Sequence, residues 1–388
     1  MKFSINKSMF SALVLFGAVS TAALSQAAQP IPSAPNIAAT SYIIMDADTG
    51  AIIAQKKANQ QFPPASLTKM MTSYITEHEL TEGNIKLDDL VPVSEKAWRT
   101  EGSRMFIQEG KQVKLEDLLK GIIIQSGNDA SVAMAEYIAG SEAAFAGLMN
   151  QHAKLLGMDN TVFSNATGLP AENHHSSPYD LALLSKAIIQ KFPQHYGIYS
   201  EKYFTYNDIK QPNRNKLLWS DKTVDGLKTG HTDEAGYCLV ASAKRDGMRL
   251  ITVVLGTKSE EARARESQKL LAYGFRFFRT HKLYEAGNQL SLAKVWGGME
   301  STVRLGVAQA VAVTIPRGQA GDLKATMDIN TEVKAPVIAG QQYGFVKIEL
   351  DGEEVKRVPL VALNAVEEGG FFKKLWDNIM LFFMGLLN

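Results

Sequence analysis

The sequence predicts an α/β (α+β) fold, in which helices lie against an antiparallel sheet, followed by a smaller all-β domain and a terminal amphipathic helix. Three observations lead to this prediction. Strand-like runs near residue 41 and from residue 225 onward enclose a series of helix patterns. After about residue 282 the helix periodicity gives way to short β-rich runs separated by Gly and Pro. From Phe371 onward, apolar residues again recur every three or four positions.

Length and composition indicate an ordinary globular protein of roughly two or three domains. Of the 388 residues, 45% are hydrophobic and 21% are charged, which is enough to build sizeable cores. The net charge of +1 provides no basic footprint, so we expect no nucleic-acid partner. Cys238 is the single cysteine, so no internal disulfide can form, and its strand-like surroundings favour a core position over a nucleophile.

The first residues have the features of a secretory signal peptide. Lys2 and Lys7 precede an apolar run over 9–24, and Ser25-Gln26-Ala27-Ala28 supplies the small residues of a cleavage site. An uncleaved anchor is the alternative, but the run is short for a membrane span. We therefore expect 1–27 to be removed and the mature chain to work outside the cytoplasm.

The first domain, expected over 28–282, begins with a hairpin and continues with five helices. Two strand patterns, Ser41–Asp46 and Ala51–Gln55, flank a turn at Ala47–Gly50. Serine N-caps open the fourth and fifth helices. The five expected helices begin near Pro64, Leu115, Ala130, Ser141 and Ser177.

The second part of this domain is rich in strands. A strand opening at 225–230 is followed by runs at Tyr237–Lys244 and Arg249–Leu255. Asp246-Gly247 between these runs is the signal of a type I′ hairpin turn. A long helix, Ser259–Phe278, ends the domain.

The β-rich segment is expected over 283–367, and the terminal helix over 368–388. The β-rich segment, of roughly 85 residues, has a plausible domain size and holds no obvious catalytic cluster. Its expected strands include Val311–Ile315, Phe345–Leu350 and Arg357–Leu363.

The terminal helix is predicted to lie in a membrane interface. After Gly369-Gly370, a stripe of large apolar residues alternates with Lys373, Lys374 and Asp377. The segment is too short and too interrupted to span a bilayer, which takes about 20 apolar residues. An amphipathic helix at the interface fits better. A helix packed on the β-rich domain is the alternative.

The helix that follows Pro64 carries the first catalytic candidates. Ser66 and Lys69 are three residues apart, so they share a face near the helix start. A serine hydroxyl needs a neighbouring base, and a buried lysine is such a base when it is neutral. A solvated serine and lysine on a surface helix are the alternative. Ser-x-x-Lys also occurs at Ser4/Lys7 and Ser291/Lys294, but neither copy opens a helix with an apolar back.

Two further motifs follow in order. Ser126-Gly127-Asn128 stands at a break between helices, and Lys228-Thr229-Gly230 opens a strand. Together with Ser66/Lys69 they match the S-x-x-K, S-x-N and K-T-G set of penicillin-binding proteins and serine β-lactamases. Across its whole length the chain resembles the low-molecular-mass, type-5 penicillin-binding proteins, the serine D-alanyl-D-alanine carboxypeptidases of bacterial cell walls. The runs that carry this resemblance are Pro64–Tyr74, Gln125–Asp129, Asn213–Asn215 and Val224–Thr232.

The resemblance implies a reaction. Ser66 would attack the carbonyl between two D-alanines of a peptidoglycan pentapeptide, Lys69 would accept its proton, and Ser126 would relay a proton to the departing D-alanine. Backbone N–H groups of Ser66 and His231 would bind the oxyanion. β-lactam antibiotics would acylate Ser66, the enzyme would serve wall remodelling and cell shape, and no cofactor or metal is implied.

The resemblance also assigns substrate-binding residues and a location. Asn128 would orient the peptide amide, and Lys228 and Thr229 would receive the terminal carboxylate. Arg214 matches a position near that carboxylate, with an ordinary surface arginine as the alternative. Gly230 belongs to the same strand motif, and Gly102-Ser103 and Gly168-Leu169 match loops that border the pocket. The location implied is the periplasmic face of the inner membrane, held by the terminal helix.

Three other functions stay open. A β-lactamase would carry a glutamate that activates the deacylating water, but the surroundings of Glu172 do not resemble that loop. We therefore predict that Glu172, His174 and His175 are polar loop residues, and no H-E-x-x-H or cysteine cluster points to a metal. The second open function is a non-catalytic protein that binds the cell wall. The third is an endopeptidase that uses the same residues.

Overall fold

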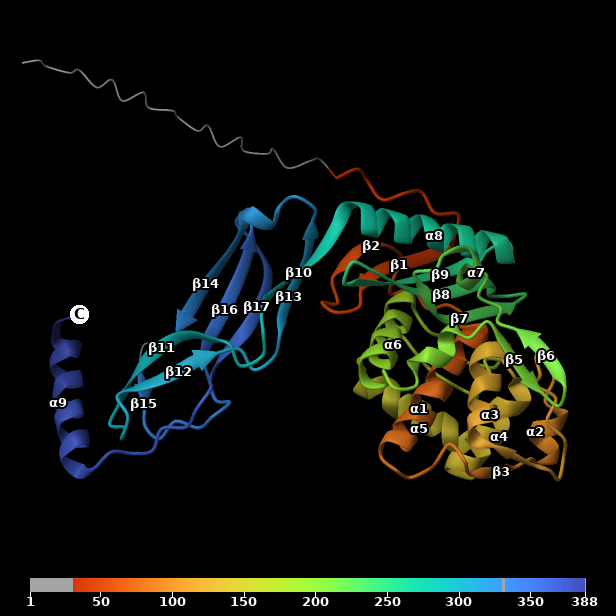
Figure 1. Cartoon of the computed structure of the whole chain (residues 1–388), viewed down its shortest axis with the longest axis horizontal. Helices are drawn as coiled ribbons and strands as arrows, with labels where there is room; N and C mark the ends of the chain where they lie inside the picture. The colour runs from red at the N-terminus through yellow and green to blue at the C-terminus, as the bar shows by residue number, and fades with distance from the viewer. Residues whose placement is uncertain (1–30, 330–331, 388) are drawn as a thin grey trace, which may run out of the picture.

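The computed structural model describes residues 31–329 and 332–387, with side chains as far as Phe383. The predicted signal peptide, 1–27, lies outside the described residues. The described chain forms a large α/β domain, a β domain and a terminal helix, in that order (Figure 1). The predicted α/β (α+β) fold class is confirmed.

The large domain is built on a five-stranded antiparallel sheet with the strand order β2-β1-β9-β8-β7. β8 and β9 form the hairpin predicted at Asp246-Gly247, where both residues have positive φ. β7 is an edge strand, which leaves one of its sides free to face the helices and the site. The strands are β1 Ser41–Asp46, β2 Ile52–Lys56, β7 Val224–Thr232, β8 Gly236–Arg245 and β9 Met248–Thr257.

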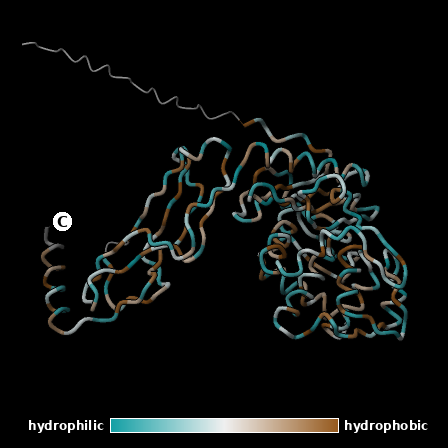
Figure 2. The backbone as a smooth tube through the Cα atoms, viewed as in Figure 1, coloured by the Kyte–Doolittle hydropathy of each residue, from teal (hydrophilic) through white to brown (hydrophobic). Residues whose placement is uncertain are grey.

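Helices cover both faces of this sheet (Figure 1). α8 (Glu260–Phe277) packs on one face, where its apolar residues share a core with β1, β8 and β9. The larger core lies on the other face and contains α1, α3, α4, α5 and α6. Figure 2 shows the hydrophobic segments gathered among these helices. Their bounds are α1 Lys69–Thr81, α3 Leu115–Lys120, α4 Asn128–Ala139, α5 Glu142–Leu155 and α6 Pro178–Lys191.

Serine caps fix the starts of three helices, as their sequences indicate. The hydroxyl oxygens of Ser141, Ser177 and Ser259 accept hydrogen bonds from the backbone N–H three residues later. Short elements that the periodicity did not reveal complete the domain. They are η1 Ala65–Thr68, β3 Leu90–Pro92, α2 Glu95–Arg99, β4 Gln112–Lys114, η2 Gly121–Gln125, η3 Tyr196–Ser200, β5 Tyr203–Tyr206, β6 Ile209–Pro212 and α7 Leu217–Ser220.

The β domain contains a two-stranded and a six-stranded sheet around one apolar core. β10 pairs with β13, and the larger sheet has the order β14-β16-β17-β12-β11-β15. The bounds are β10 Phe278–Tyr284, β11 Gln289–Trp296, β12 Thr302–Gly306, β13 Val311–Pro316, η4 Ala320–Asp322, β14 Leu323–Ile329, β15 Val333–Lys334, β16 Gln342–Leu350 and β17 Glu353–Ala362.

The structure differs from the expected domain boundary at 282/283. β10 crosses that boundary and pairs along its length with β13. α8 passes directly into β10 at Phe278, without a linker. The sequence gives no clear sign of this transition, because no Gly or Pro lies between Phe275 and Tyr284. Side chains bridge the two domains: the Thr49 and Thr314 hydroxyls lie 2.6 Å apart, the Thr280 hydroxyl donates to Asp46, and Arg317 Nε donates to the Phe275 carbonyl oxygen at 3.0 Å.

The terminal helix, α9 (Phe371–Leu387), lies at the end of the β domain that is distant from the large domain (Figure 1). The buried carboxylate of Asp377 accepts hydrogen bonds from the Gly297 N–H at 2.8 Å and from Lys373 at 3.2 Å. The apolar residues stay outside this contact, and Phe372 is 84% exposed and Trp376 65% exposed. Among the described residues, no helix combines the length and apolar character needed to cross a membrane.

Candidate active site

Ser66 lies in η1, a single 3-10 turn that precedes α1, rather than in the first turn of the α-helix itself. Its neighbour Ala65 has a φ of 48°, which turns the chain sharply before the serine. Gly230 of β7 lies against this turn, where an added Cβ would be 3.1 Å from the Pro64 carbonyl oxygen. The absence of a side chain at Gly230 therefore lets the nucleophile turn approach the edge of the sheet.

Lys69 is fully buried and its amine is held by three oxygens. The Nζ atom lies 3.1 Å from Ser66 Oγ, 2.6 Å from Asn128 Oδ1 and 2.5 Å from the Thr167 carbonyl oxygen. A neutral amine has two N–H groups and one lone pair. The two carbonyl oxygens accept the two N–H groups, so the lone pair is left for the Ser66 hydroxyl.

Burial lowers the pKa of Lys69 to about 7, with a further decrease from the Arg214 cation and an opposing effect of Asp129. Desolvation disfavours the charged amine, because no water replaces its lost hydration. A large share of Lys69 is therefore neutral near pH 7. Arg214 is the neighbouring cation that contributes here.

Ser126 and Asn128 occupy the break that the sequence predicted. Ser126 follows the π-helical turn η2 and has a left-handed backbone, with φ 68°. Its hydroxyl oxygen is buried and has no hydrogen-bond partner. Asn128, at the start of α4, accepts from Lys69 and donates from Nδ2 to the Glu101 carbonyl oxygen at 2.5 Å. A buried, unpartnered hydroxyl in a cleft is a sign that it serves a ligand.

Asp129 organises the loop that forms one wall of the site, a role that sequence analysis missed. Its carboxylate accepts backbone N–H groups from Met105, Phe106 and Ile107 at 3.0, 2.9 and 3.2 Å. The same loop is joined to Asn128, whose N–H donates to the Ser103 carbonyl oxygen at 2.6 Å. The signal was present, since an aspartate in the first turn of a helix is a common acceptor for backbone N–H groups.

The opposite wall is β7, where Lys228 and Thr229 are buried and His231 is exposed. Burial and the charges of Lys69, Arg214 and Arg263 hold the pKa of Lys228 well below its usual range. The Lys228 amine donates only to the Thr229 carbonyl oxygen, at 3.2 Å. An anion that enters beside this amine would restore its charge.

These residues enclose a polar cleft of about 240 Å³. Arg263 of α8, a second residue that sequence analysis missed, is buried in its wall and donates to the Gly230 carbonyl oxygen at 3.2 Å. Its position in a long amphipathic helix resembles that of any polar-face arginine, so periodicity offered no signal. The cleft lining includes Ser66, Ser103, Ser126, Arg214, Thr229, Gly230, His231, Tyr237, Glu260 and Arg263. The predicted residues thus lie close together. Two arginines, Arg214 and Arg263, and one carboxylate, Glu260, line the cleft.

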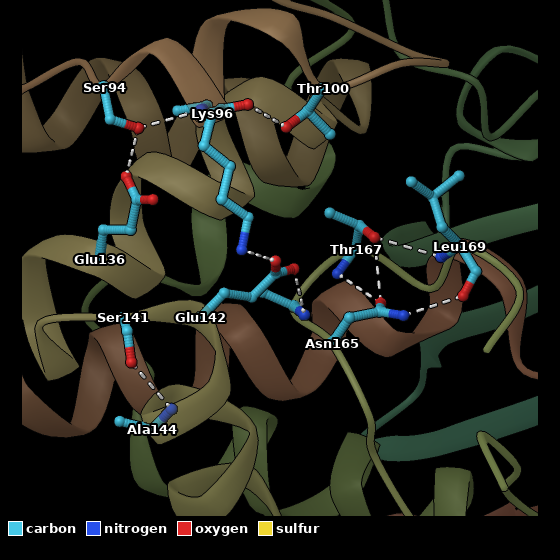
Figure 3. A network of polar contacts seen from close by, with 12 residues as sticks. Ser94, Lys96, Thr100, Glu136, Ser141, Glu142, Ala144, Asn165, Thr167 and Leu169 are labelled. Carbon is cyan, nitrogen blue, oxygen red and sulfur yellow. Dashed lines mark hydrogen bonds and ion pairs between the residues drawn. The ribbon is translucent and has the colours of Figure 1, made fainter. Parts of the chain in front are cut away.

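The loop over 165–169 contacts Lys69 through the Thr167 carbonyl oxygen and is held by its own polar contacts (Figure 3). Asn165 Oδ1 accepts the N–H groups of Thr167 and Gly168, and its Nδ2 donates to the Leu169 carbonyl oxygen. Glu142 accepts the Ala166 N–H and forms an ion pair with Lys96 at 2.7 Å. This network fixes the Thr167 carbonyl oxygen that contacts Lys69.

His174 is buried and hydrogen-bonded to the turn that carries Ser66, which corrects the prediction that it is an ordinary polar loop residue. It is buried, its Nδ1 accepts the Ser164 N–H at 3.1 Å, and its Nε2 lies 2.8 Å from Thr68 Oγ1. Because Nδ1 is an acceptor, the ring is neutral and Nε2 donates to Thr68. Burial, with smaller effects of His175 and Lys69, lowers the pKa of His174 to about 4.

Other candidates of the sequence lie elsewhere or lack the expected chemistry. Glu172 is exposed, and Cys238 is buried with its pKa raised to about 11 by desolvation. Ser291 and Lys294 lie on β11 of the β domain, and Ser4 and Lys7 are outside the described residues. Within the described part of the chain, no three His, Cys, Asp or Glu side chains are grouped so as to hold a metal ion.

Comparison with known protein families gives two matches. The profile of the D-alanyl-D-alanine carboxypeptidases matches residues 28–259, and that of the penicillin-binding protein 5 C-terminal domain matches 278–368. The D-alanyl-D-alanine carboxypeptidase DacC of Escherichia coli is 47% identical over 365 residues, covering 92% of this chain and 91% of that protein. DacA of the same organism is 46% identical over 361 residues, covering 91% and 90%.

Solved structures agree with the sequence relatives. Penicillin-binding protein 5 of Haemophilus influenzae superimposes with a TM-score of 0.84 at 43% identity, covering 87% of this chain and all of that one. The ampicillin-bound form of penicillin-binding protein D2 from Listeria monocytogenes has a TM-score of 0.58 at 31% identity. It covers 62% of this chain and 100% of its own. With both domain profiles and relatives matched along most of its length, the chain belongs to the serine D-alanyl-D-alanine carboxypeptidase family of penicillin-binding proteins.

Proposed function

We propose that the protein removes the terminal D-alanine from peptidoglycan pentapeptides through an acyl-enzyme on Ser66. The contact set of Lys69 carries this proposal: a buried amine with a pKa of about 7, whose lone pair faces the Ser66 hydroxyl. Lys69 takes the hydroxyl proton as Ser66 Oγ bonds to the carbonyl carbon. The oxyanion that forms is stabilised by the backbone N–H groups of Ser66 and His231.

The collapse of this intermediate releases D-alanine. Ser126, whose buried hydroxyl has no partner, relays the proton from Lys69 to the departing nitrogen. The bond between carbon and nitrogen breaks, and the acyl group stays on Ser66. Water then attacks the ester, with Lys69 again as the base, and frees the shortened peptide. Asn128, which already contacts Lys69, orients the amide of the substrate.

The cationic half of the cleft binds the terminal carboxylate. Lys228, Thr229 and Arg214 are the proposed contacts, and Gly230 leaves room beside the nucleophile. Charge-assisted hydrogen bonds to a desolvated carboxylate are strong, and they compensate the repulsion between the cations. This requirement favours a carboxypeptidase, because the substrate must end one residue after the scissile bond.

β-lactams are proposed to acylate Ser66 and to leave slowly. A fused-ring β-lactam has a carbonyl and a carboxylate at the separation of the peptide's own groups, so it uses the same contacts. Fast deacylation would need a second base, and Glu172 is an exposed residue outside the cleft. β-lactamase activity is therefore not the favoured function.

We further propose that the chain acts on the periplasmic side of the inner membrane, held there by α9. Supporting this are the signal-peptide pattern of 1–27 and the exposed apolar side of α9. Asp377 fixes the helix to the β domain, and the β domain separates it from the active site. With α9 in the membrane interface, the cleft would lie on the periplasmic side, where stem peptides of the wall are accessible.

Mass spectrometry of a pentapeptide incubated with the purified enzyme tests the reaction. Loss of one D-alanine is expected from the wild type, and none from Ser66→Ala, which should remain folded. Cleavage of a crosslinked dimer at a comparable rate would indicate an endopeptidase. A covalent penicillin adduct on Ser66→Ala would refute the nucleophile assignment.

A further inference from the structure

We infer that a second pocket beside the catalytic cleft binds the side chain of the diamino acid that precedes D-alanyl-D-alanine, through its free amine. The inference rests on the proposed function and identifies a specificity subsite for it. The pocket has a volume of about 240 Å³ and is formed by three segments: 61–65, 168–175, and the turn after β7 at Thr232 and Glu234.

At two points of the chain, a residue that lines this pocket is bonded to one that lines the catalytic cleft. Ala65 lines the pocket and Ser66 lines the cleft; likewise Thr232 lines the pocket and His231 the cleft. The two arginines of the site, Arg214 and Arg263, line the cleft and not this pocket. The pocket therefore lies on the acyl side of Ser66, where the rest of the stem peptide must run.

The geometry of β7 sets which substrate residue reaches the pocket. β7 is an edge strand, so an extended peptide can lie along its free side. Each residue of an extended chain advances about 3.3 Å. With the acyl D-alanine beside Gly230 and His231, the preceding residue lies beside Thr232, and its side chain points to the pocket or to solvent.

The pocket offers an apolar wall and an acidic mouth. Leu169, Pro170 and Phe62 line the pocket and would contact the methylene groups of a long side chain. Glu234 is exposed at the mouth and has no ion-pair partner among the described residues. A chain of methylenes that ends in an ammonium group matches this combination.

Hydrogen bonds hold the residues that line the pocket, so the pocket has a defined shape for one kind of side chain. Asn165 holds Leu169, as Figure 3 shows, and His174 is held by Thr68 and Ser164. The turn that carries Glu234 is closed by the Thr232 hydroxyl, which accepts the Ala235 N–H at 3.1 Å. Ala235 is buried, so Glu234 is displayed from a fixed backbone.

The neighbouring residue provides a matched control. Asp233 is also an exposed carboxylate in the same turn, but it does not line the pocket. Substituting either residue by its amide changes the net charge equally. Only a specific contact, and not the general field of the protein, distinguishes Glu234→Gln from Asp233→Asn.

The experiment compares two substrates on the full chain. One is an N-acylated L-lysyl-D-alanyl-D-alanine, and the other carries an acetyl group on the lysine side-chain amine. We expect wild-type kcat/KM to favour the free amine roughly two- to fivefold, the effect of one solvent-accessible charge pair. The preference should disappear in Glu234→Gln, remain in Asp233→Asn, and shrink at high ionic strength.

A third measurement separates this inference from the proposed function. The rate of penicillin acylation should be the same in all three proteins, because it needs only the cleft. Equal rates for the two peptides in the wild type, or a preference that survives Glu234→Gln, would overturn the subsite alone. If neither peptide lost D-alanine while penicillin still acylated Ser66, both the proposed function and the subsite would be refuted.

Discussion

His174 Nε2 donates a hydrogen bond across 2.8 Å to Oγ1 of Thr68, the residue that precedes the general base in the chain. Both side chains are buried, so the bond ties the loop over 164–174 to the turn that carries Ser66. The Ser164 N–H holds the other ring nitrogen. His174 therefore acts on the nucleophile turn through packing and hydrogen bonds.

Replacing His174 by alanine should slow penicillin acylation and lower the melting temperature. The change leaves Thr68 and the Ser164 N–H without their partner, and the loss at the buried Thr68 hydroxyl costs about 1–3 kcal/mol. His174→Gln should recover part of the loss, because its amide can donate to Thr68. His175→Ala, at the adjacent half-buried position, is the control and should acylate as fast as the wild type.

The pH dependence of acylation should report Lys69. Its pKa of about 7 means that the neutral, catalytic amine rises from about one-tenth at pH 6 to about nine-tenths at pH 8. The acylation rate should increase over this window and then level off. His174, with a pKa of about 4, is already neutral at pH 6, so its titration does not contribute to the rise of the acylation rate.

The measurement is the acylation rate with a fluorescent penicillin between pH 5 and 9, at fixed ionic strength. Melting temperatures at each pH confirm that the enzyme stays folded. A flat profile would show that Lys69 is not the titrating base.

Removal of the Asp129 carboxylate should collapse the loop that faces Ser66. Three backbone donors, from Met105 to Ile107, would lose their acceptor, so Asp129→Ala should destabilise the protein by about 2–4 kcal/mol. Acylation should fall as well, because Asn128 and Ser103 are joined through the same loop. Denaturant unfolding and acylation rates measure both effects. Asp159→Ala, at an exposed aspartate, should change neither.

Glu77, a buried carboxyl group on α1, should make stability depend on pH. Burial raises its pKa to about 8, against a smaller lowering by the hydrogen bond from Tyr199. The folded state therefore binds a proton that the unfolded state has released above its ordinary pKa of 4.5. The stabilisation is complete below pH 4.5 and is lost as pH rises through 8.

Glu77→Gln keeps a neutral group of the same shape and removes this proton. Its stability relative to the wild type should improve by about 1.4 kcal/mol per pH unit between pH 4.5 and 8, and then stay constant. Unfolding by denaturant at several pH values tests this. Parallel curves for the two proteins would show that Glu77 is ionised in the folded state.

Truncation before Phe371 should release the enzyme from membranes without affecting its chemistry. Every residue of the proposed catalytic site lies in the large domain, and the exposed apolar side chains of α9 are removed. Flotation with anionic vesicles measures binding, and penicillin acylation measures the site. A full-length variant with Phe372→Ser and Trp376→Ser should bind as weakly as the truncated chain. Equal flotation of truncated and full-length chains would rule out the anchor.

The sequence by itself determined the features that depend on neighbouring residues. Serine caps at Ser141, Ser177 and Ser259 and the Asp246-Gly247 turn were predictable, because a cap or a turn is completed within about four residues. Each of the three motifs is also contained within four residues. Their order along the chain indicated the fold class and the candidate residues of the site. The strand periodicity located the β domain for the same reason.

The tertiary structure decided the features that join distant parts of the chain. The neutral state of Lys69 depends on burial and on Asn128, the Thr167 carbonyl oxygen and the Arg214 charge, which three separate segments supply. His174 and Arg263 had no local signal, since a loop histidine and a helix arginine look alike wherever they pack. The passage of α8 into β10 was hidden because β10 finds its partner, β13, only after an intervening hairpin. Long-range packing sets desolvation and charge proximity, and these two quantities make the site reactive.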